Sequence, residues 1–103
     1  MKIPKSVKVG KTKITVLQPD GLKVGKDICR GGYNYEENVL MVAKSNLVRN
    51  TKFSESQRSN TFWHELTHAI LHDMGEDRLN HNEKFVSAFA DRLDQAIKTA
   101  RFE

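Results

Sequence analysis

The sequence predicts an α+β fold in which a small, mostly antiparallel sheet packs on two C-terminal helices. Short alternating or β-branched segments, separated by glycine and proline, fill the first half of the chain. In the second half, apolar residues recur every three or four positions. With 103 residues and 38% hydrophobic residues, the chain has the usual size and composition of a soluble globular domain. A single domain over residues 1–103 is therefore expected.

Strands are expected from about residue 6 to residue 44. The first two, residues 7–9 and 13–17, alternate polar and apolar side chains or run β-branched on either side of Gly10, which is typical of a hairpin. Pro19-Asp20-Gly21 then supplies a strong turn.

The rest of the sheet is expected in two further segments. An extended piece covers residues 22–29 and ends at Gly31-Gly32. The apolar run at residues 38–44 has the length of a strand, and the polar residues 45–54 follow it as a connection. Three or four strands then form one sheet.

The first helix is predicted over about residues 55–74. Ser54 and Gln57 fit a capping box, with the serine at the N-cap and the glutamine at the third helical position. Gly75 supplies a stop signal, because glycine readily adopts the left-handed conformation that ends helices.

The second helix is predicted over about residues 82–101. Its start lies near Asn80-His81-Asn82-Glu83, which is itself a capping-box pattern with Glu83 at the third helical position. On a helical wheel, Glu83 falls beside Val86, Ser87 and Ala90, at one margin of an expected apolar arc. The helix should therefore point Glu83 towards the core. The apolar periodicity is carried by Phe85, Phe89, Leu93, Ala96 and Ala100.

Charge and cysteine content narrow the classes of function. The net charge is +4, with +6 in residues 1–50 and −2 in residues 51–103. The basic residues of the first half are interleaved with valine and isoleucine, which is typical of the solvated face of a sheet, so nucleic-acid binding is not the favoured reading. Cys29 is the only cysteine, which excludes an intrachain disulfide and a thiolate-rich zinc site.

Neither a membrane span nor a secretory signal is expected. No stretch approaches the roughly 18 unbroken apolar residues of a membrane helix. The N-terminus carries charge but no apolar segment behind it. A cytoplasmic protein is therefore expected.

His64-Glu65-Leu66-Thr67-His68 carries the chemistry of this sequence. On a helix, histidines four residues apart project from one face and can bind one ion. Glu65 is displaced around the helix from both ligands, but near enough to contact a water on the metal. This HExxH pattern is typical of zinc peptidases, in which the zinc lowers the pKa of its water and the glutamate takes the proton.

A third protein ligand must come from elsewhere, since catalytic zinc sites use three and leave a fourth position for water. The downstream candidates are His72, Glu76, Asp77, His81 and Glu83. His72 continues the same helical stripe but is carried away from the ion, so a packing or hydrogen-bonding role is favoured. His81 and Glu83 remain nearly equal candidates on spacing alone.

The two helices together resemble the ImmA/IrrE-like metallopeptidases, especially the short forms carried by bacteriophages and mobile elements. The resemblance rests on His64-Glu65-Leu66-Thr67-His68-Ala69-Ile70-Leu71-His72 and on Glu83-Lys84-Phe85-Val86-Ser87-Ala88-Phe89-Ala90. It implies that Glu83 is the third ligand, as in gluzincins, with one Zn²⁺ per chain. It also implies a minimal zincin-like fold, with a small twisted sheet on the metal-binding helix and residues 38–43 as the strand that borders the cleft and pairs with an extended peptide.

The sequence departs from the family pattern at Ser87, where an Asp or Asn often supports a histidine ligand. Charge also develops on the carbonyl oxygen during hydrolysis, and Tyr33, Tyr35, His72 and His81 are the candidate donors to it. For Tyr33 and Tyr35, a role as ordinary half-buried tyrosines is the favoured interpretation.

The leading hypothesis is a zinc peptidase with Glu65 as general base and His64, His68 and Glu83 as ligands. By analogy with the longer relatives, its substrate would be a protein or peptide such as a repressor or a host regulatory protein. The alternatives are a small zinc-stabilised phage protein that binds a host factor without catalysis, and nucleic-acid binding through the basic half.

Overall fold

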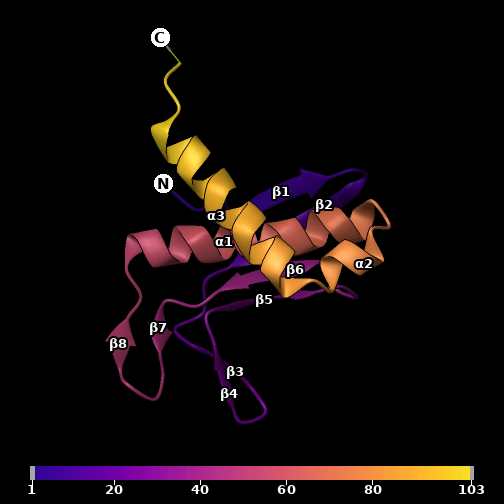
Figure 1. The fold of residues 1–103 in the computed structure, drawn as a ribbon. Helices are drawn as coiled ribbons and strands as arrows, with labels where there is room; N and C mark the ends of the chain where they lie inside the picture. Colours follow the sequence, from indigo (N-terminus) through magenta and orange to yellow (C-terminus); the bar gives the residue numbers. More distant parts are fainter. Residues whose placement is uncertain (1, 103) are drawn as a thin grey trace.

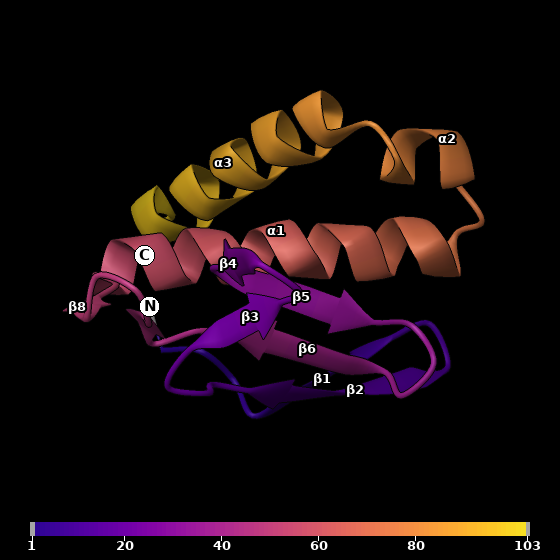
Figure 2. The same cartoon turned by 90° about the horizontal axis from the view of Figure 1, so that it is seen from below.

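A computed structural model describes residues 2–102 of the chain. The predicted α+β class is confirmed: a four-stranded sheet lies on one side of a long helix, and another long helix lies on the other (Figures 1 and 2). In chain order the elements are β1 (Ser6–Val9), β2 (Thr12–Leu17), β3 (Leu22–Val24), β4 (Asp27–Cys29), β5 (Gly31–Asn34), β6 (Val39–Val42), β7 (Ser45–Asn46), β8 (Thr51–Lys52), α1 (Glu55–Asp73), α2 (Asp77–Asn80) and α3 (Glu83–Thr99).

The main sheet has the strand order β1-β2-β6-β5 and is mixed. β1 and β2 form the expected antiparallel hairpin, and Gly10 supplies the turn with a φ of 57°. β2 runs parallel to β6, whereas β5 and β6 are antiparallel. The outer edge of β5 is therefore an edge of this sheet, next to α1.

Two expectations for the sheet were wrong. Residues 22–29 do not form one strand of the main sheet, because the chain reverses at Gly25, with a φ of 62°, and β3 pairs with β4 as a separate hairpin. Residues 45–54, expected as a plain connection, contain the short β7–β8 hairpin. Both hairpins extend from the body of the molecule (Figure 1).

The expectation that residues 38–43 form the strand bordering the cleft was also wrong. β6, within residues 38–43, is paired on both sides by β2 and β5 and offers no free edge to a peptide. Gly31 and Gly32, predicted to end an extended piece, instead open the edge strand β5. A strand that begins with two glycines was missed because glycine has low strand propensity, and here the pairing with β6 overrides that propensity.

The core lies between the main sheet and α1. It combines alternate residues of β2 and β6 with one stripe of α1, as expected for side-chain periods of two and 3.6 residues. These buried residues are Ile14, Val16, Leu40, Val42, Phe62, Leu66 and Ala69. Among residues 2–102, no helix is long and apolar enough to cross a membrane.

α1 begins as predicted. Ser54 is its N-cap and forms a reciprocal capping box with Gln57. The helix ends at Asp73, followed by Gly75 with a φ of 74°. The short helix α2, not expected from the sequence, then carries the chain to α3.

α3 differs from its prediction in its start and in its buried face. Its N-cap is Asn82, whose side chain accepts from the backbone N–H of Phe85, so Glu83 is the first helical residue rather than the third. Its buried residues are Val86, Ala90 and Asp94, whereas Phe89 is 46% exposed. The face of α3 that packs on α1 is thus the one that carries Glu83, and the phenylalanines lie beside it.

Candidate metal centre

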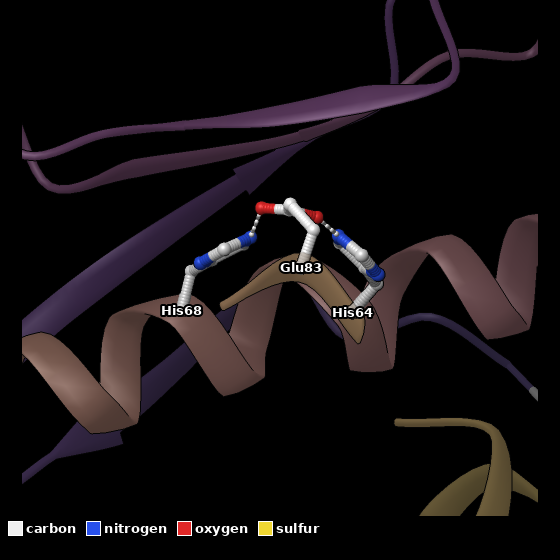
Figure 3. Close-up of side chains that lie close together, drawn as sticks. All are labelled: His64, His68 and Glu83. Atoms are coloured by element: carbon white, nitrogen blue, oxygen red, sulfur yellow. Dashed lines mark ion pairs between the residues drawn. The ribbon is translucent and has the colours of Figure 1, made fainter. Parts of the chain in front are cut away.

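α1 places the two motif histidines side by side. His64 and His68 lie one turn apart on the same face, and their ring centroids are 5.1 Å apart (Figure 3). The flanking Phe62, Leu66 and Ala69 are buried in the core, which fixes the rotation of the helix. The imidazoles are consequently held at the junction of α1 with α3, partly shielded from water, with side-chain exposures of 23% and 11%.

Glu83 brings a carboxylate between the two imidazoles (Figure 3). Its Oε2 lies 3.2 Å from Nε2 of His64, and its Oε1 lies 3.1 Å from Nε2 of His68. The packing of Val86 and Ala90 against α1 orients the first turn of α3 and hence this side chain. One ligand atom from each of the three residues lies within 4.8 Å of the others, so the group could hold a metal ion.

The hydrogen-bonding chemistry of His68 fits a cation at this point. Nδ1 of His68 lies 2.6 Å from Oδ1 of Asn80, an acceptor, and Nε2 faces Oε1 of Glu83, also an acceptor. A neutral imidazole has one N–H and can donate to only one of them. With that proton on Nδ1, the lone pair of Nε2 points at a carboxylate oxygen, and a cation between these two atoms resolves the conflict.

Glu65 directly follows His64 on α1, and its carboxyl lies in a different environment from the two imidazoles. Burial raises the pKa of its carboxyl from an ordinary 4.5 to about 7; the neighbouring His68 works to lower it and Glu83 to raise it. It lines a cavity of about 290 Å³ together with Arg30, Gly31, Asn60, Thr61, His64 and Ser87. Glu65 is thus a proton acceptor poised near neutral pH, beside the three clustered side chains.

His64 is the histidine on this cavity. Burial lowers the pKa of its imidazole below the usual range, against the opposing effect of the Glu83 carboxylate. A lower pKa keeps the imidazole neutral at physiological pH, which is the form that binds metals.

Two further histidines lie outside the cluster. His72 is exposed, and its ring makes an edge contact with Tyr35 at 4.7 Å between centroids, in keeping with the packing role favoured for it. His81, the rival of Glu83 as third ligand, is also exposed, and its Nδ1 lies 2.7 Å from the carbonyl oxygen of Asp77 in its own turn. The structure brings Glu83, and not His81, to the two motif histidines.

The expected supporting residues are arranged differently. The hydroxyl of Tyr33 donates to Asn38, and burial raises its pKa. Tyr35 accepts from the side-chain N–H of Asn80, which leaves its own proton available. Ser87 lines the cavity, but within residues 2–102 it makes no hydrogen bond to either histidine.

Asn80 is the site residue that sequence reasoning missed. It is 8% exposed and contacts His68 at one end of its amide and Tyr35 at the other. Its place in a capping pattern suggested a local backbone role, which Asn82 fills instead. Only the reversal of the chain after Gly75 brings Asn80 back over α1, and no spacing rule anticipates that.

Comparisons with known proteins add no relative. No protein-family model matches the chain, and neither a curated protein nor a solved structure does. What the site can do is therefore judged from its own residues and their geometry.

Proposed function

We propose that the chain is a zinc-dependent peptidase of the ImmA/IrrE-like kind. The observation that carries the proposal is the convergence of His64, His68 and Glu83 within 4.8 Å, beside a partly buried carboxyl, Glu65, from the same motif. Two imidazole nitrogens and one carboxylate oxygen are a donor set that suits zinc, and three protein ligands are the number that catalytic zinc sites use. We therefore assign His64, His68 and Glu83 as the residues that would hold one Zn²⁺.

Zinc bound there would supply Lewis-acid chemistry, polarising a carbonyl and making a water acidic near neutral pH. Glu65 has the matching task of accepting a proton, because its carboxyl lies in the wall of the cavity that His64 also lines. It takes the proton of the attacking water as oxygen bonds to the carbonyl carbon. It then passes that proton to the amine nitrogen as the C–N bond breaks.

The edge strand β5 offers a place for the substrate. Its outer edge pairs with no other strand of the main sheet, and Gly31 at its start lines the same cavity as His64 and Glu65. An extended peptide added to this edge would run past Glu65, with its backbone held by hydrogen bonds. This assigns to β5 the role that the family resemblance implied for residues 38–43. A protein or peptide, such as a repressor or host regulatory protein, is the proposed substrate class.

The test is the substitution Glu65→Gln. We expect the variant to keep about one zinc per chain by elemental mass spectrometry, because Glu65 is not a ligand. We expect hydrolysis of a mixed-sequence peptide library, followed by mass spectrometry, to fall about 100- to 10,000-fold, the usual effect of losing a general base. Cleavage of the same bonds at the parental rate would contradict the mechanism.

A non-catalytic, zinc-stabilised binding protein is the second candidate. An apolar groove of about 400 Å³ between the three helices favours it, lined by Thr67, Ile70, Leu71, Met74, Glu76, Leu79, Phe85, Phe89 and Leu93. Under this reading Glu65→Gln leaves biological activity intact, whereas His64→Ala abolishes it by destabilising the fold.

A further inference from the structure

Asn80 is a buried polar residue whose side-chain oxygen and nitrogen both make polar contacts. It closes α2 and is 8% exposed. Its Oδ1 lies 2.6 Å from Nδ1 of His68, and its Nδ2 donates to the hydroxyl of Tyr35 over 3.3 Å. Buried amides are costly unless their polar atoms are paired, so these contacts account for an asparagine at this position.

The structure places Nδ2 of Asn80 at the hydroxyl of Tyr35 and Oδ1 at the ring of His68. Tyr35 follows β5, and its ring packs edge-on against Tyr33 at 4.9 Å and against His72 at 4.7 Å. With Nδ2 directed at this hydroxyl, Oδ1 faces His68, and a hydrogen bond between Oδ1 and Nδ1 needs the proton on Nδ1. The lone pair of Nε2 then faces Glu83, on the side where the three ligand atoms meet.

We propose that Asn80 is a positioning residue that holds His68 with its proton on Nδ1, so that Nε2 is presented to the metal. The inference rests on the proposed zinc site and goes beyond its ligand set. Metal-bound histidines commonly donate their other ring N–H to an oxygen, which sets ring orientation and raises ligand basicity. Here that oxygen comes from the linker helix α2, rather than from Ser87 on the helix that carries Glu83.

Three substitutions separate this role from a general effect on folding. Asn80→Leu removes both contacts, whereas Asn80→Asp keeps an oxygen for His68 and loses the donor to Tyr35. Ser87→Ala is the matched control, since Ser87 lines the cavity on the His64 side and, in the described part of the chain, makes no hydrogen bond to either histidine. The zinc dissociation constant of each folded protein would be measured by competition with a chromogenic chelator.

We expect Asn80→Leu to bind zinc about 10- to 100-fold more weakly than the parent, and Asn80→Asp and Ser87→Ala to stay within about threefold. In the zinc-loaded parent and in Asn80→Asp, long-range ¹H–¹⁵N spectra should show a His68 Nδ1 proton protected from exchange with water. In Asn80→Leu that proton should exchange rapidly.

Two results would overturn the proposal: equal zinc affinity in the parent and Asn80→Leu, or an Asn80→Asp variant as weak as Asn80→Leu. A merely structural asparagine would give the second result, with lower thermal stability in both variants. Zinc binding without any peptide hydrolysis would remove the peptidase function and leave the outcome for Asn80 readable. A parent that binds no zinc would overturn both proposals.

Discussion

The two histidines of the candidate site lie in different surroundings. His68 is the more enclosed, with its side chain 11% exposed and its Nδ1 in contact with Asn80. His64 is 23% exposed and opens on a cavity shared with Arg30 and Gly31. In the described part of the chain, no hydrogen bond engages Nδ1 of His64.

This difference indicates a division of labour within one cluster. A catalytic metal site needs ligands held in a fixed geometry and also an open position that substrate can reach. The His68 side has the fixed geometry, because α2 and Tyr35 brace it. The His64 side has the open space, with Glu65 in its wall. The asymmetry supports the peptidase proposal over a purely structural zinc site, which would be closed all round.

The largest effect is expected from Glu83→Ala, which removes the carboxylate that contacts both His64 and His68. With two protein ligands left, zinc affinity should fall by more than about 100-fold, beyond the effect of losing a supporting hydrogen bond. Competition with a chromogenic chelator would measure the affinity, and elemental mass spectrometry on protein purified without chelator would measure the zinc content per chain. Glu76→Ala is the control, since Glu76 is exposed and outside the cluster. If Glu83→Ala binds zinc as tightly as the parent, the ligand set is wrong.

A second prediction concerns Glu65, which lines the cavity next to His64, and the pH dependence of the protein's stability. Because burial raises the pKa of Glu65 from 4.5 to about 7, the folded metal-free protein keeps a proton that the unfolded chain releases between these values. The stability of the metal-free protein should therefore fall as pH rises from about 4.5 to 7, by at most about 3 kcal/mol.

Glu65→Gln cannot ionise and should lack this part of the pH dependence. Urea unfolding of both metal-free proteins at pH 5 and pH 8 would measure it. Parallel pH profiles for parent and variant would show that Glu65 is not desolvated. Saturating zinc should reduce the difference, since a nearby cation favours the carboxylate.

A smaller effect is expected from Gly31→Ala, where β5 meets α1. A Cβ at Gly31 would lie 2.5 Å from Cγ2 of Thr61 and 2.7 Å from the carbonyl oxygen of Met41, so strand and helix must separate. We expect a loss of about 1–3 kcal/mol in the free energy of unfolding, the usual cost of overpacking.

Gly32→Ala is the matched control for that substitution. A Cβ there would meet only Cδ2 of Leu22, at an ordinary 3.7 Å, so stability should change by less than about 0.5 kcal/mol. Thermal and urea unfolding of both variants would measure the contrast. Equal losses would mean that strand propensity, and not the close approach to α1, decides the cost.

The local features of the helices were predictable from the sequence. The Ser54–Gln57 capping box sets the start of α1, and the four-residue spacing of His64 and His68 puts both on one face, because these features depend only on helix geometry. Where the chain packed against distant segments, prediction failed. The glycine-rich β5 and the exposure of Phe89 depend on neighbours that no local pattern names.

The sequence by itself determined the α+β class, the two long helices and the pair of histidines, because periodicity and capping are short-range properties. On spacing, His81 and Glu83 were nearly equal, and the tertiary structure brought Glu83 to the two histidines, as the family resemblance implied. The cap at Asn82 and the burial of Val86 direct Glu83 onto α1 and leave His81 exposed. The reversal of the chain after Gly75 likewise brings Asn80 into contact with His68. Such contacts arise from how α1, α2 and α3 pack together, which is a long-range property.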